Sequence, residues 1–352
     1  MSQTRAPGRK TRFGVVGAGL WGSFHCQTLN AIEASELYAV CDLNPERAAE
    51  MQRQFGATKV YTDYRDLLAD PDVEAVTVAT PDFAHGDIVL AAIKAGKHVM
   101  SEKPLATTLA EVEAIASAAA VSGTKTMVDF HNRVSPPIVA VKQAVAAGEI
   151  GVPLHASARL SNTQFVPFEL LSWAAKSSAL WFLGSHALDA LRFIMGAEVK
   201  RVQAMARHGH LAGKGVDTAD VHMALLEFDN GCVATLQNSW VLPLDLPSIV
   251  DFRIDIVGEK GAVETYPTMN DVVKKYTGNG LRGADVIGIT PTAGGRIGGF
   301  VTEAIARFVD AVVLDAPVLA DARDGLQVTR VLVAIEESAK TGKTITLADG
   351  VA

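Results

Sequence analysis

Apolar and polar residues alternate in different ways in the two parts of this chain. In the first third, short apolar runs rich in β-branched residues are separated by segments whose apolar residues recur at helical spacing. The apolar runs are 12–17, 37–42, 73–80, 97–103 and 125–130, and the helical segments include 85–96 and 108–123. Apolar strands separated by amphipathic helices predict a doubly wound parallel α/β sheet with both faces covered.

The pattern changes after residue 135. A helical segment is followed by strands in which apolar and polar residues alternate, as in an antiparallel sheet with one covered face. The helix is 138–147, the strands are 154–161, 199–209, 221–228, 232–242 and 252–258, the last helices are 299–314 and 324–340, and 277–298 is a long loop. Since 352 residues are long for one core, we predict two domains, 1–133 and 134–352.

The composition excludes several classes of protein. Half the residues are hydrophobic (49%) and 20% are charged, which is typical of a globular protein. The net charge of −7 provides no basic surface for nucleic acid or anionic membrane. No uncharged apolar run reaches the roughly 18 residues of a membrane span. The polar, basic start MSQTRAPGRK lacks the apolar core of a secretory signal and is predicted to be disordered.

The three cysteines, Cys26, Cys41 and Cys232, lie far apart and form no CxxC pair. Such cysteines are typical of buried thiols in a reducing compartment, so we predict a cytoplasmic protein. The histidines have no spacing typical of metal ligands, and we predict no catalytic metal.

The segment GAGLWG (17–22) matches G-x-G-x-x-G, the dinucleotide-binding fingerprint. It follows a predicted strand and precedes a helix, so Gly17 permits the turn, Gly19 the approach of a pyrophosphate and Gly22 close helix packing. Asp42 ends the second strand, twenty residues after Gly22. A carboxylate at this position accepts hydrogen bonds from the ribose hydroxyls and repels a 2′-phosphate. The predicted cofactor is NAD, bound in this segment by Gly17, Gly19, Leu20, Trp21, Gly22 and Asp42.

Two further segments, ATPDFAH (79–85) and SEKPLA (101–106), follow predicted strands. Ligands of doubly wound sheets bind beyond the carboxyl ends of such strands. A lysine buried beside a nicotinamide has a lowered pKa, which suits Lys103 to exchange the proton of a hydroxyl as hydride moves.

These motifs, in this order, together with the C-terminal segment FVDAVVLDAPVLADARDGLQVTRVLVAIEESAKTGKTITL, resemble the glucose–fructose oxidoreductase, inositol dehydrogenase and rhizopine-catabolism (Gfo/Idh/MocA) family over nearly the whole chain. The resemblance implies a Rossmann domain joined to an α/β domain with a large open antiparallel sheet. It also implies hydride transfer at a carbinol carbon of a sugar or cyclitol. Homodimers or homotetramers packed through the second sheet are expected as well.

The resemblance also assigns residues. Lys103 matches the catalytic lysine of the EKP motif, and His186 matches the family's active-site histidine. Arg133 and Asn132 match a segment bordering the site, and Asp82 stands where an asparagine is common. The remaining residues matched to cofactor binding are Thr80, Pro81, His85 and Glu102, with Asn132 and Lys103.

The family pattern D-x-G-x-H-x-x-D is present with one change: Phe182 stands where the first carboxylate is expected, before His186 and Asp189. Three explanations of the missing carboxylate remain open. Lys103 and His186 are sufficient for catalysis, or another acid (Asp189, Asp217 or Asp220) replaces the missing one. In the third explanation, oxidation is not the net reaction. Phe182, Trp173, Arg133 and Asp189 are predicted to border the substrate, with Phe182 accepting an apolar part of it.

Three functions compete. The leading prediction is an NAD-dependent dehydrogenase of a sugar, glycoside or cyclitol. The second is a glycosidase or lyase that uses NAD for transient oxidation of the sugar ring, a known alternative to the two-carboxylate mechanism. The third is a dinucleotide-binding regulator with a decayed site, against which the retention of Lys103 and His186 argues.

Overall fold

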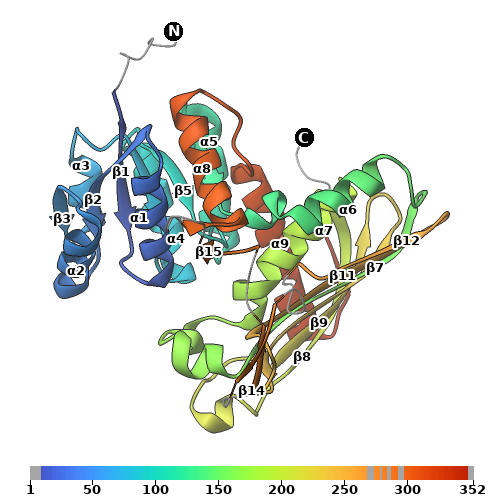
Figure 1. Ribbon diagram of the computed structural model, residues 1–352. Coiled ribbons are helices and arrows are strands. Elements are labelled where there is room, and N and C mark those ends of the chain that lie inside the picture. The colour runs from blue at the N-terminus through green and yellow to red at the C-terminus, as the bar shows by residue number, and fades with distance from the viewer. Residues whose placement is uncertain (1–8, 268–272, 278–279, 284–286, 292–296, 348–352) are drawn as a thin grey trace.

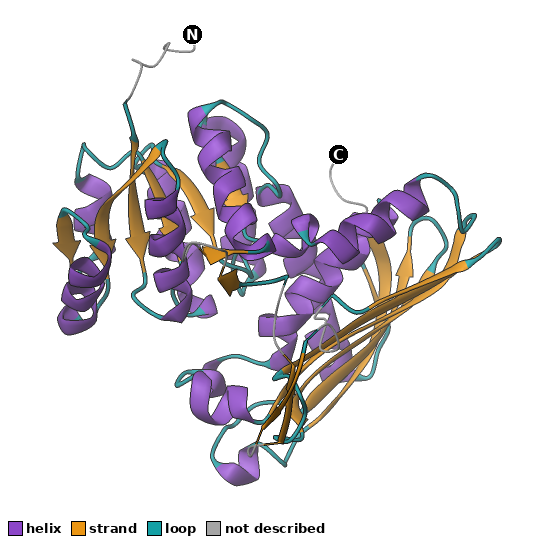
Figure 2. Ribbon diagram, viewed as in Figure 1, coloured by secondary structure: helices purple, strands orange, loops and turns teal. Residues whose placement is uncertain are grey.

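The computed structural model describes residues 9–267, 273–277, 280–283, 287–291 and 297–347 (Figure 1). The predicted disordered start therefore lies, except for its last two residues, outside the described residues, as do parts of the predicted loop 277–298. Two sheets dominate the fold, and helices lie between and around them (Figure 2).

The first sheet has six parallel strands in the order β3-β2-β1-β4-β5-β6, which confirms the predicted parallel sheet. Its order reverses between β1 and β4, the place where doubly wound sheets bind ligands. The strands are β1 (Thr11–Val16), β2 (Ser35–Cys41), β3 (Lys59–Tyr61), β4 (Ala75–Val78), β5 (His98–Ser101) and β6 (Thr126–Val128). The helices between them are α1 (Leu20–Ala31), α2 (Pro45–Phe55), α3 (Tyr64–Ala69), α4 (His85–Lys94) and α5 (Leu109–Ser122).

Local sequence explains where these helices start and stop. Asn44 caps α2 by accepting hydrogen bonds from two main-chain N–H groups of its first turn, and Gly56 ends it in the left-handed conformation. Thr108 caps α5 and Gly123 ends it in the same way. Each of these helix start and stop signals depends on a single residue, so it can be recognised in the sequence.

The second sheet has seven strands in the order β12-β11-β7-β10-β9-β8-β17. It is mixed and not wholly antiparallel, because β7 and β10 pair in parallel while the other pairs are antiparallel. The strands are β7 (Pro153–Thr163), β8 (Val199–Arg207), β9 (Val221–Phe228), β10 (Val233–Leu242), β11 (Val250–Gly258), β12 (Ala262–Thr265) and β17 (Ile345–Thr346). Short strands also occur near and within the predicted loop: β13 (Lys274–Thr277), β14 (Gly280–Gly283), β15 (Thr290–Pro291) and β16 (Ile297–Gly298).

Helices cover one face of the second sheet (Figure 2). They are α6 (Pro136–Ala146), α7 (Ser185–Met195) and α9 (Ala322–Thr341). On the other face, Met205, Met223 and Leu225 are exposed by 74%, 54% and 50%. The helix-covered face is therefore the core side, as the alternation of apolar residues predicts.

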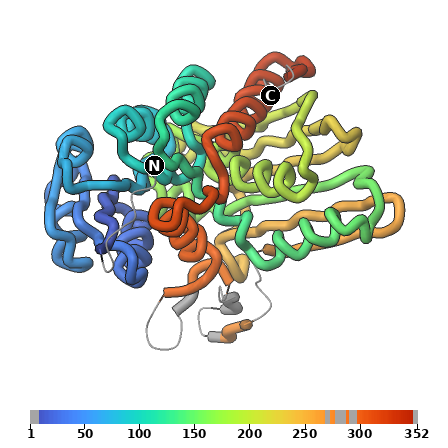
Figure 3. The backbone as a smooth tube through the Cα atoms, turned by 90° about the horizontal axis from the view of Figure 1, so that it is seen from above, coloured from blue at the N-terminus to red at the C-terminus, as the bar shows by residue number. Residues whose placement is uncertain are grey.

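The C-terminal helices return to the first sheet. Helix α8 (Phe300–Val313) packs against α1, and the ring of Phe308 lies 6.0 Å from that of Phe13 on β1. Figure 3 shows α8 and α9 passing between the parts of the molecule that the two sheets form. The core of the first sheet thus includes residues from the far end of the chain, and the division at 133/134 stays a prediction.

Short helical turns lie at the ends of the longer elements. They are η1 (Asp82–Ala84), η2 (His131–Val134), η3 (Val166–Leu170), η4 (Ala174–Lys176), η5 (Leu180–Gly184) and η6 (Ala212–Lys214). Among the helices that the structure describes, none is both long and apolar enough to cross a membrane.

Candidate active site

The Gly-rich turn between β1 and α1 leaves room for a ligand. Gly17 has a φ of +106°, and a Cβ there would lie 2.5 Å from the main-chain oxygen of Ala79. A Cβ on Gly22 would lie 1.9 Å from the oxygen of Gly17, whereas one on Gly19 would meet nothing within 4 Å. Gly17 and Gly22 are thus required by backbone packing, and Gly19 leaves open space over the turn.

The start of α1 faces this space. No side chain caps the helix, so the first N–H groups, including those of Leu20 and Trp21, remain available for an anion. The indole of Trp21 stacks on the ring of His131, with 5.9 Å between ring centroids, and so borders the same region from the side of β6.

Asp42 lies at the end of β2 with its carboxylate held in place. The N–H of Ala18 donates to Oδ2 and that of Asn44 to Oδ1, each at 2.8 Å. A carboxylate accepts up to about four hydrogen bonds, so capacity remains for ribose hydroxyls. Leu43, which follows, is 87% exposed and brings no cation for a 2′-phosphate. This arrangement suits NAD.

The segment after β4 is fastened to the segment after β5 by His85. One ring nitrogen lies 2.7 Å from the main-chain oxygen of Pro104 and the other 2.9 Å from that of Thr80. The main-chain oxygen of Pro81 accepts a hydrogen bond from Ala84 in the first turn of η1. His85 therefore joins the segments that follow β4 and β5 at the carboxyl end of the sheet.

Lys103 follows β5 and is 6% exposed. Its Nζ donates to the main-chain oxygen of Phe182 at 2.7 Å and lies 4.2 Å from the centroid of the Phe182 ring. Burial lowers the pKa of Lys103, although the charges of Glu102, Asp82 and Asp129 oppose the shift. Lys103 is thus a buried amine poised to exchange a proton.

Phe182 lies in the π-helical turn η5, immediately before α7. Its ring also contacts Trp173, at 6.0 Å between centroids, and Trp240, at 5.9 Å. Trp173 in turn lies 6.2 Å from Phe83. Aromatic side chains from three separate segments therefore surround the place where the family pattern has a carboxylate, and a main-chain oxygen binds the lysine there.

His186, at the start of α7, is 8% exposed. Its Nδ1 has no hydrogen-bond partner among the described residues, and its ring lies 4.6 Å from that of His131. Burial lowers the pKa of His186 well below its ordinary value, and the charges of Lys103 and His131 add to the shift. The ring is therefore neutral at physiological pH.

Close packing fixes this turn against the second sheet. A Cβ on Gly184 would lie 2.7 Å from Oδ1 of Asn238 on β10, so only glycine allows the helix to approach the strand this closely. Asn238 itself donates to the main-chain oxygen of Leu160 at 3.0 Å.

Asp189 and Arg133 lie beneath the site and not at its surface. Nε and Nη2 of Arg133 donate to the two carboxylate oxygens of Asp189 at 2.9 and 2.7 Å, and Nη1 donates to Asp324 on α9 at 2.9 Å. Asp189 is fully buried. Because this bidentate pair joins η2, α7 and α9, we propose that both residues position His186 and do not touch substrate. Asn132 lies buried in η2 beside them.

Asp220 and Asp217 are the other acids considered as replacements for the missing carboxylate. Asp220 accepts hydrogen bonds from the N–H groups of His210 and Leu211 at 3.0 and 2.8 Å and pairs with Arg207. Asp217 is exposed. The carboxylate of Asp220 is therefore already occupied by partners within the protein.

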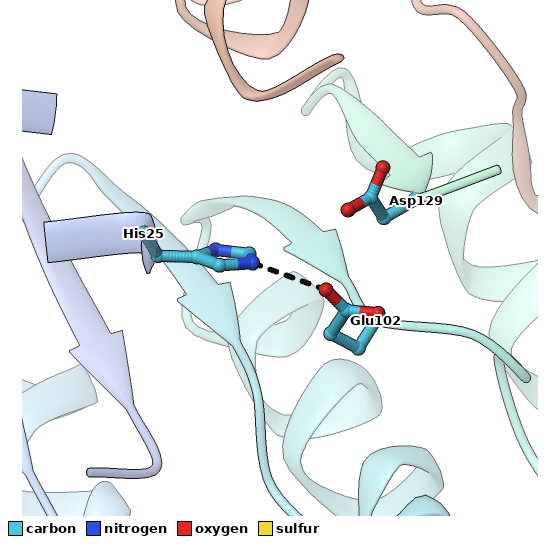
Figure 4. A group of neighbouring side chains, drawn as sticks. All are labelled: His25, Glu102 and Asp129. Carbon is cyan, nitrogen blue, oxygen red and sulfur yellow. Dashed lines mark hydrogen bonds and ion pairs between the residues drawn. The ribbon is translucent and has the colours of Figure 1, made fainter. Parts of the chain in front are cut away.

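The structure adds a cluster that the sequence analysis missed: His25 on α1, Glu102 after β5, and Asp129 after β6 (Figure 4). Nε2 of His25 lies 3.2 Å from Oε1 of Glu102, and one donor atom from each residue lies within 4.8 Å of the others. Neither oxygen of Asp129 has a hydrogen-bond partner among the described residues. This donor set is of a kind that divalent cations use, so the expected absence of a metal stays a prediction.

The Gly-rich turn, the uncapped start of α1 and the carboxylate of Asp42 together fit a dinucleotide, and the buried amine of Lys103 lies beyond the neighbouring strands. Fold and site define an oxidoreductase with an NAD-binding Rossmann domain. Residues 11–130 match the oxidoreductase family described as "NAD-binding Rossmann fold", and residues 138–264 match the GFO/IDH/MocA C-terminal domain.

The chain is similar to myo-inositol 2-dehydrogenase of Thermotoga maritima, with 32% identity over 72% of this chain and 74% of the relative. It is 33% identical to inositol 2-dehydrogenase of Acidothermus cellulolyticus over 79% of each chain. The crystal structure of scyllo-inositol dehydrogenase from Lactobacillus casei with NAD(H) and scyllo-inositol has the same fold, with a TM-score of 0.83, 20% identity and coverage of 96% and 99% of the two chains.

The chain therefore belongs to the Gfo/Idh/MocA oxidoreductase family. It is an NAD-dependent dehydrogenase of the class that acts on CH–OH groups. This confirms the predicted family, fold class, enzyme class and cofactor.

Proposed function

We propose that the chain oxidises a ring carbinol of a cyclitol, sugar or glycoside. The observation that carries this proposal is that two buried groups with lowered pKa values, Lys103 and His186, lie close enough for the charge of Lys103 to act on His186. The inositol dehydrogenases among its relatives support a polyhydroxylated ring as substrate.

The roles proposed for the side chains follow from their chemistry. Bound NAD supplies the acceptor for the hydride. Lys103, once deprotonated, takes the proton of the reacting hydroxyl, and its contact with the main-chain oxygen of Phe182 orients it. His186, on which the charge of Lys103 acts, binds the same or a neighbouring hydroxyl, and Arg133 and Asp189 hold the helix that carries it.

The aromatic surroundings favour a substrate with an apolar portion. A carboxylate at position 182 would bring a solvated charge to this region, whereas the ring of Phe182 offers contact area and a stacking face together with Trp173. Phe83, which contacts Trp173, is 40% exposed and extends the apolar surface towards solvent. A glycoside with an apolar aglycone therefore suits the site better than a free inositol does.

The same aromatic surface supports a second candidate. A glycosidase or lyase that oxidises a ring hydroxyl transiently would use the same Lys103 and NAD, and would also have to seat the group that leaves. The two candidates differ in whether NADH accumulates.

A screen of inositols, free sugars and glycosides at fixed NAD, followed by NADH absorbance and by product analysis, tests both candidates. Net NADH formation on a polyol supports the dehydrogenase. Release of an aglycone without net NADH supports the second candidate, and cofactor binding with no turnover on any member contradicts both.

We also propose a homodimer or homotetramer formed through the uncovered face of the second sheet. Met205, Met223 and Leu225 line that face on β8 and β9, and three exposed large apolar side chains on adjacent strands are typical of an interface. The buried free thiols of the three cysteines are consistent with a reducing compartment such as the cytoplasm. Size-exclusion chromatography with light scattering, repeated on Met223→Lys, tests the assembly.

A further inference from the structure

Asp129 is a buried acid that has no role in the proposed oxidation. It follows β6, its side chain is completely buried, and neither carboxylate oxygen has a hydrogen-bond partner among the described residues. Buried carboxylates are nearly always paired or hydrogen-bonded, since burying an isolated charge is expensive. A carboxyl in this position is therefore either protonated or balanced by a cation close to it.

Titratable groups from three other elements face Asp129. His25 comes from α1, Glu102 and Lys103 follow β5, and His131 lies in η2 (Figure 4 draws His25, Glu102 and Asp129). Nδ1 of His131 lies 3.5 Å from Oδ2 of Asp129, close enough for an ionic interaction but not a hydrogen bond. The Nε2 atom of His25 lies within hydrogen-bond distance of Glu102 and not of Asp129.

The two acids of this cluster differ in protonation. Burial raises the pKa of Asp129, and the charge of Glu102 raises it further, although His131 and His25 oppose the shift. Burial acts in the same direction on Glu102, but the hydrogen bond from His25 and the charges of His25, Lys103 and His131 lower its pKa to about 2. The pKa values of the two acids are therefore shifted in opposite directions, and burial without a hydrogen-bond partner favours the protonated form of Asp129 over that of Glu102.

The position of the cluster relates it to the cofactor. The pyrophosphate belongs at the start of α1, and the adenosine half belongs on the side of β2, where Asp42 lies. The nicotinamide half would then lie towards the ends of β4, β5 and β6, the side of the sheet on which Lys103 and Asp129 follow their strands. The oxidised nicotinamide is a cation and the reduced one is neutral, so only the oxidised form favours a second carboxylate there.

We propose that Asp129 is a proton-linked sensor of the redox state of the cofactor: it ionises when NAD⁺ binds and stays protonated when NADH binds. The O–H bond of the carboxyl breaks, the proton passes to solvent, and no electrons move. NAD⁺ binding is then coupled to the release of one proton and is weaker in acid, whereas NADH binding is not. The inference rests on NAD binding alone and not on the proposed substrate.

Lys103 is also a titratable group that a cation nearby affects, and burial lowers its pKa while it raises that of Asp129. Substitution separates the two groups: a pH dependence that is lost in Asp129→Asn and kept in Lys103→Met belongs to Asp129.

Titration calorimetry of the purified protein with NAD⁺ and with NADH, in two buffers of different ionisation enthalpy across the pH range of stability, counts the protons released. We expect close to one proton released with NAD⁺ on the acid side and none with NADH. NAD⁺ affinity should then rise by up to about tenfold for each pH unit in that range. Asp129→Asn should abolish this limb, and Lys103→Met should retain it.

A matched control is Glu336→Gln. Burial raises the pKa of Glu336 too, and its Oε1 accepts a hydrogen bond from the indole of Trp181 at 2.7 Å, which a glutamine oxygen also accepts. Glu336 lies on α9, outside the cluster, so its substitution should leave the proton count unchanged.

Equal proton counts and equal pH dependence for NAD⁺ and NADH would overturn the proposal, and this comparison needs no variant if Asp129→Asn fails to fold. The acid limb persisting in folded Asp129→Asn would overturn it as well. So would a stoichiometric divalent metal, found by elemental analysis of the purified protein and lost in Asp129→Asn, because the cluster would then be a metal site.

Discussion

The side-chain nitrogen of Lys103 lies 2.7 Å from the main-chain oxygen of Phe182 and 4.2 Å from the centre of its ring. A residue that lacks the expected carboxylate therefore still binds the lysine, through its backbone and its π face. Position 182 adds no further negative side chain, and burial lowers the pKa of Lys103 against the charges of Glu102, Asp82 and Asp129.

Replacement of Lys103 by methionine should remove most turnover while leaving NAD affinity nearly unchanged, because a general base contributes about a hundred- to ten-thousand-fold. Steady-state kinetics and calorimetry measure the two quantities. Lys94→Met, at an exposed position on α4, serves as the control. Near-normal turnover of Lys103→Met on the best substrate would remove Lys103 from the mechanism.

The pH profile should change when Phe182 is replaced by aspartate. Oxidation needs the unprotonated amine, which is present above the pKa of Lys103, so the rate falls as the pH falls through that value. A carboxylate beside Lys103 stabilises the ammonium and raises its pKa, so the acid limb of kcat should move to higher pH. Binding of apolar glycosides should weaken, while turnover of free inositols should improve.

Phe182→Leu distinguishes a role in the substrate site from simple packing. It introduces no charge, so the pH profile should not move, but loss of the ring should raise KM for glycosides more than for inositols. If Phe182→Leu keeps every kinetic constant and only its melting temperature falls, Phe182 is a packing residue.

Cofactor choice should depend on Asp42. Its carboxylate is held by the N–H groups of Ala18 and Asn44, and Asp42→Ala removes both the acceptor for ribose hydroxyls and the charge that repels a 2′-phosphate. We expect weaker NAD binding and a narrower gap between NAD and NADP in calorimetric titrations. NADP binding as tight as NAD binding in the unmodified protein would contradict this role.

The ion pair of Arg133 and Asp189 should be structural. Asp189→Asn leaves the buried guanidinium without one of its two carboxylates, and breaking a buried pair from one side costs about 3–5 kcal/mol. The free energy of unfolding, from denaturant titration, should fall accordingly. A stable Asp189→Asn protein with a large change in KM would instead place Asp189 at the substrate.

Acid stability should depend on Asp70. Burial raises the pKa of Asp70, but hydrogen bonds from Lys59 and Tyr61 lower it more, to about 2. Because the pKa is lower in the folded state, the stabilisation is present above the ordinary value of 3.8 and is lost as pH falls from there towards about 2. Because Lys59 is partly exposed, we expect the charge of Asp70 to contribute about 1–2 kcal/mol to the free energy of unfolding.

Unfolding midpoints of Asp70→Asn and the unmodified protein should thus differ at neutral pH and converge as the pH falls towards about 2. Glu149→Gln, at an exposed position, is the control. A constant difference at all pH values would show that Asp70 acts through packing and not through its charge.

The sequence by itself determined the first sheet, the cofactor and the family. Strand and helix periodicity, the spacing of Gly17, Gly19 and Gly22, and Asp42 at a strand end are local features, so they can be read along the chain. Lys103 was also predictable, because a residue that follows an apolar strand lies at the edge where parallel strands end.

Tertiary structure decided which side chains meet at that edge. His25 and Glu102 are 77 residues apart, and Lys103 and Phe182 are 79 apart, so each contact depends on strand order and on the packing of the second sheet against the first. The unpartnered state of Asp129 is likewise invisible in the sequence, where it is one acid among 39 acidic residues. Periodicity specifies which face of an element is buried, but charge state depends on neighbours that only the folded chain brings within a few ångströms.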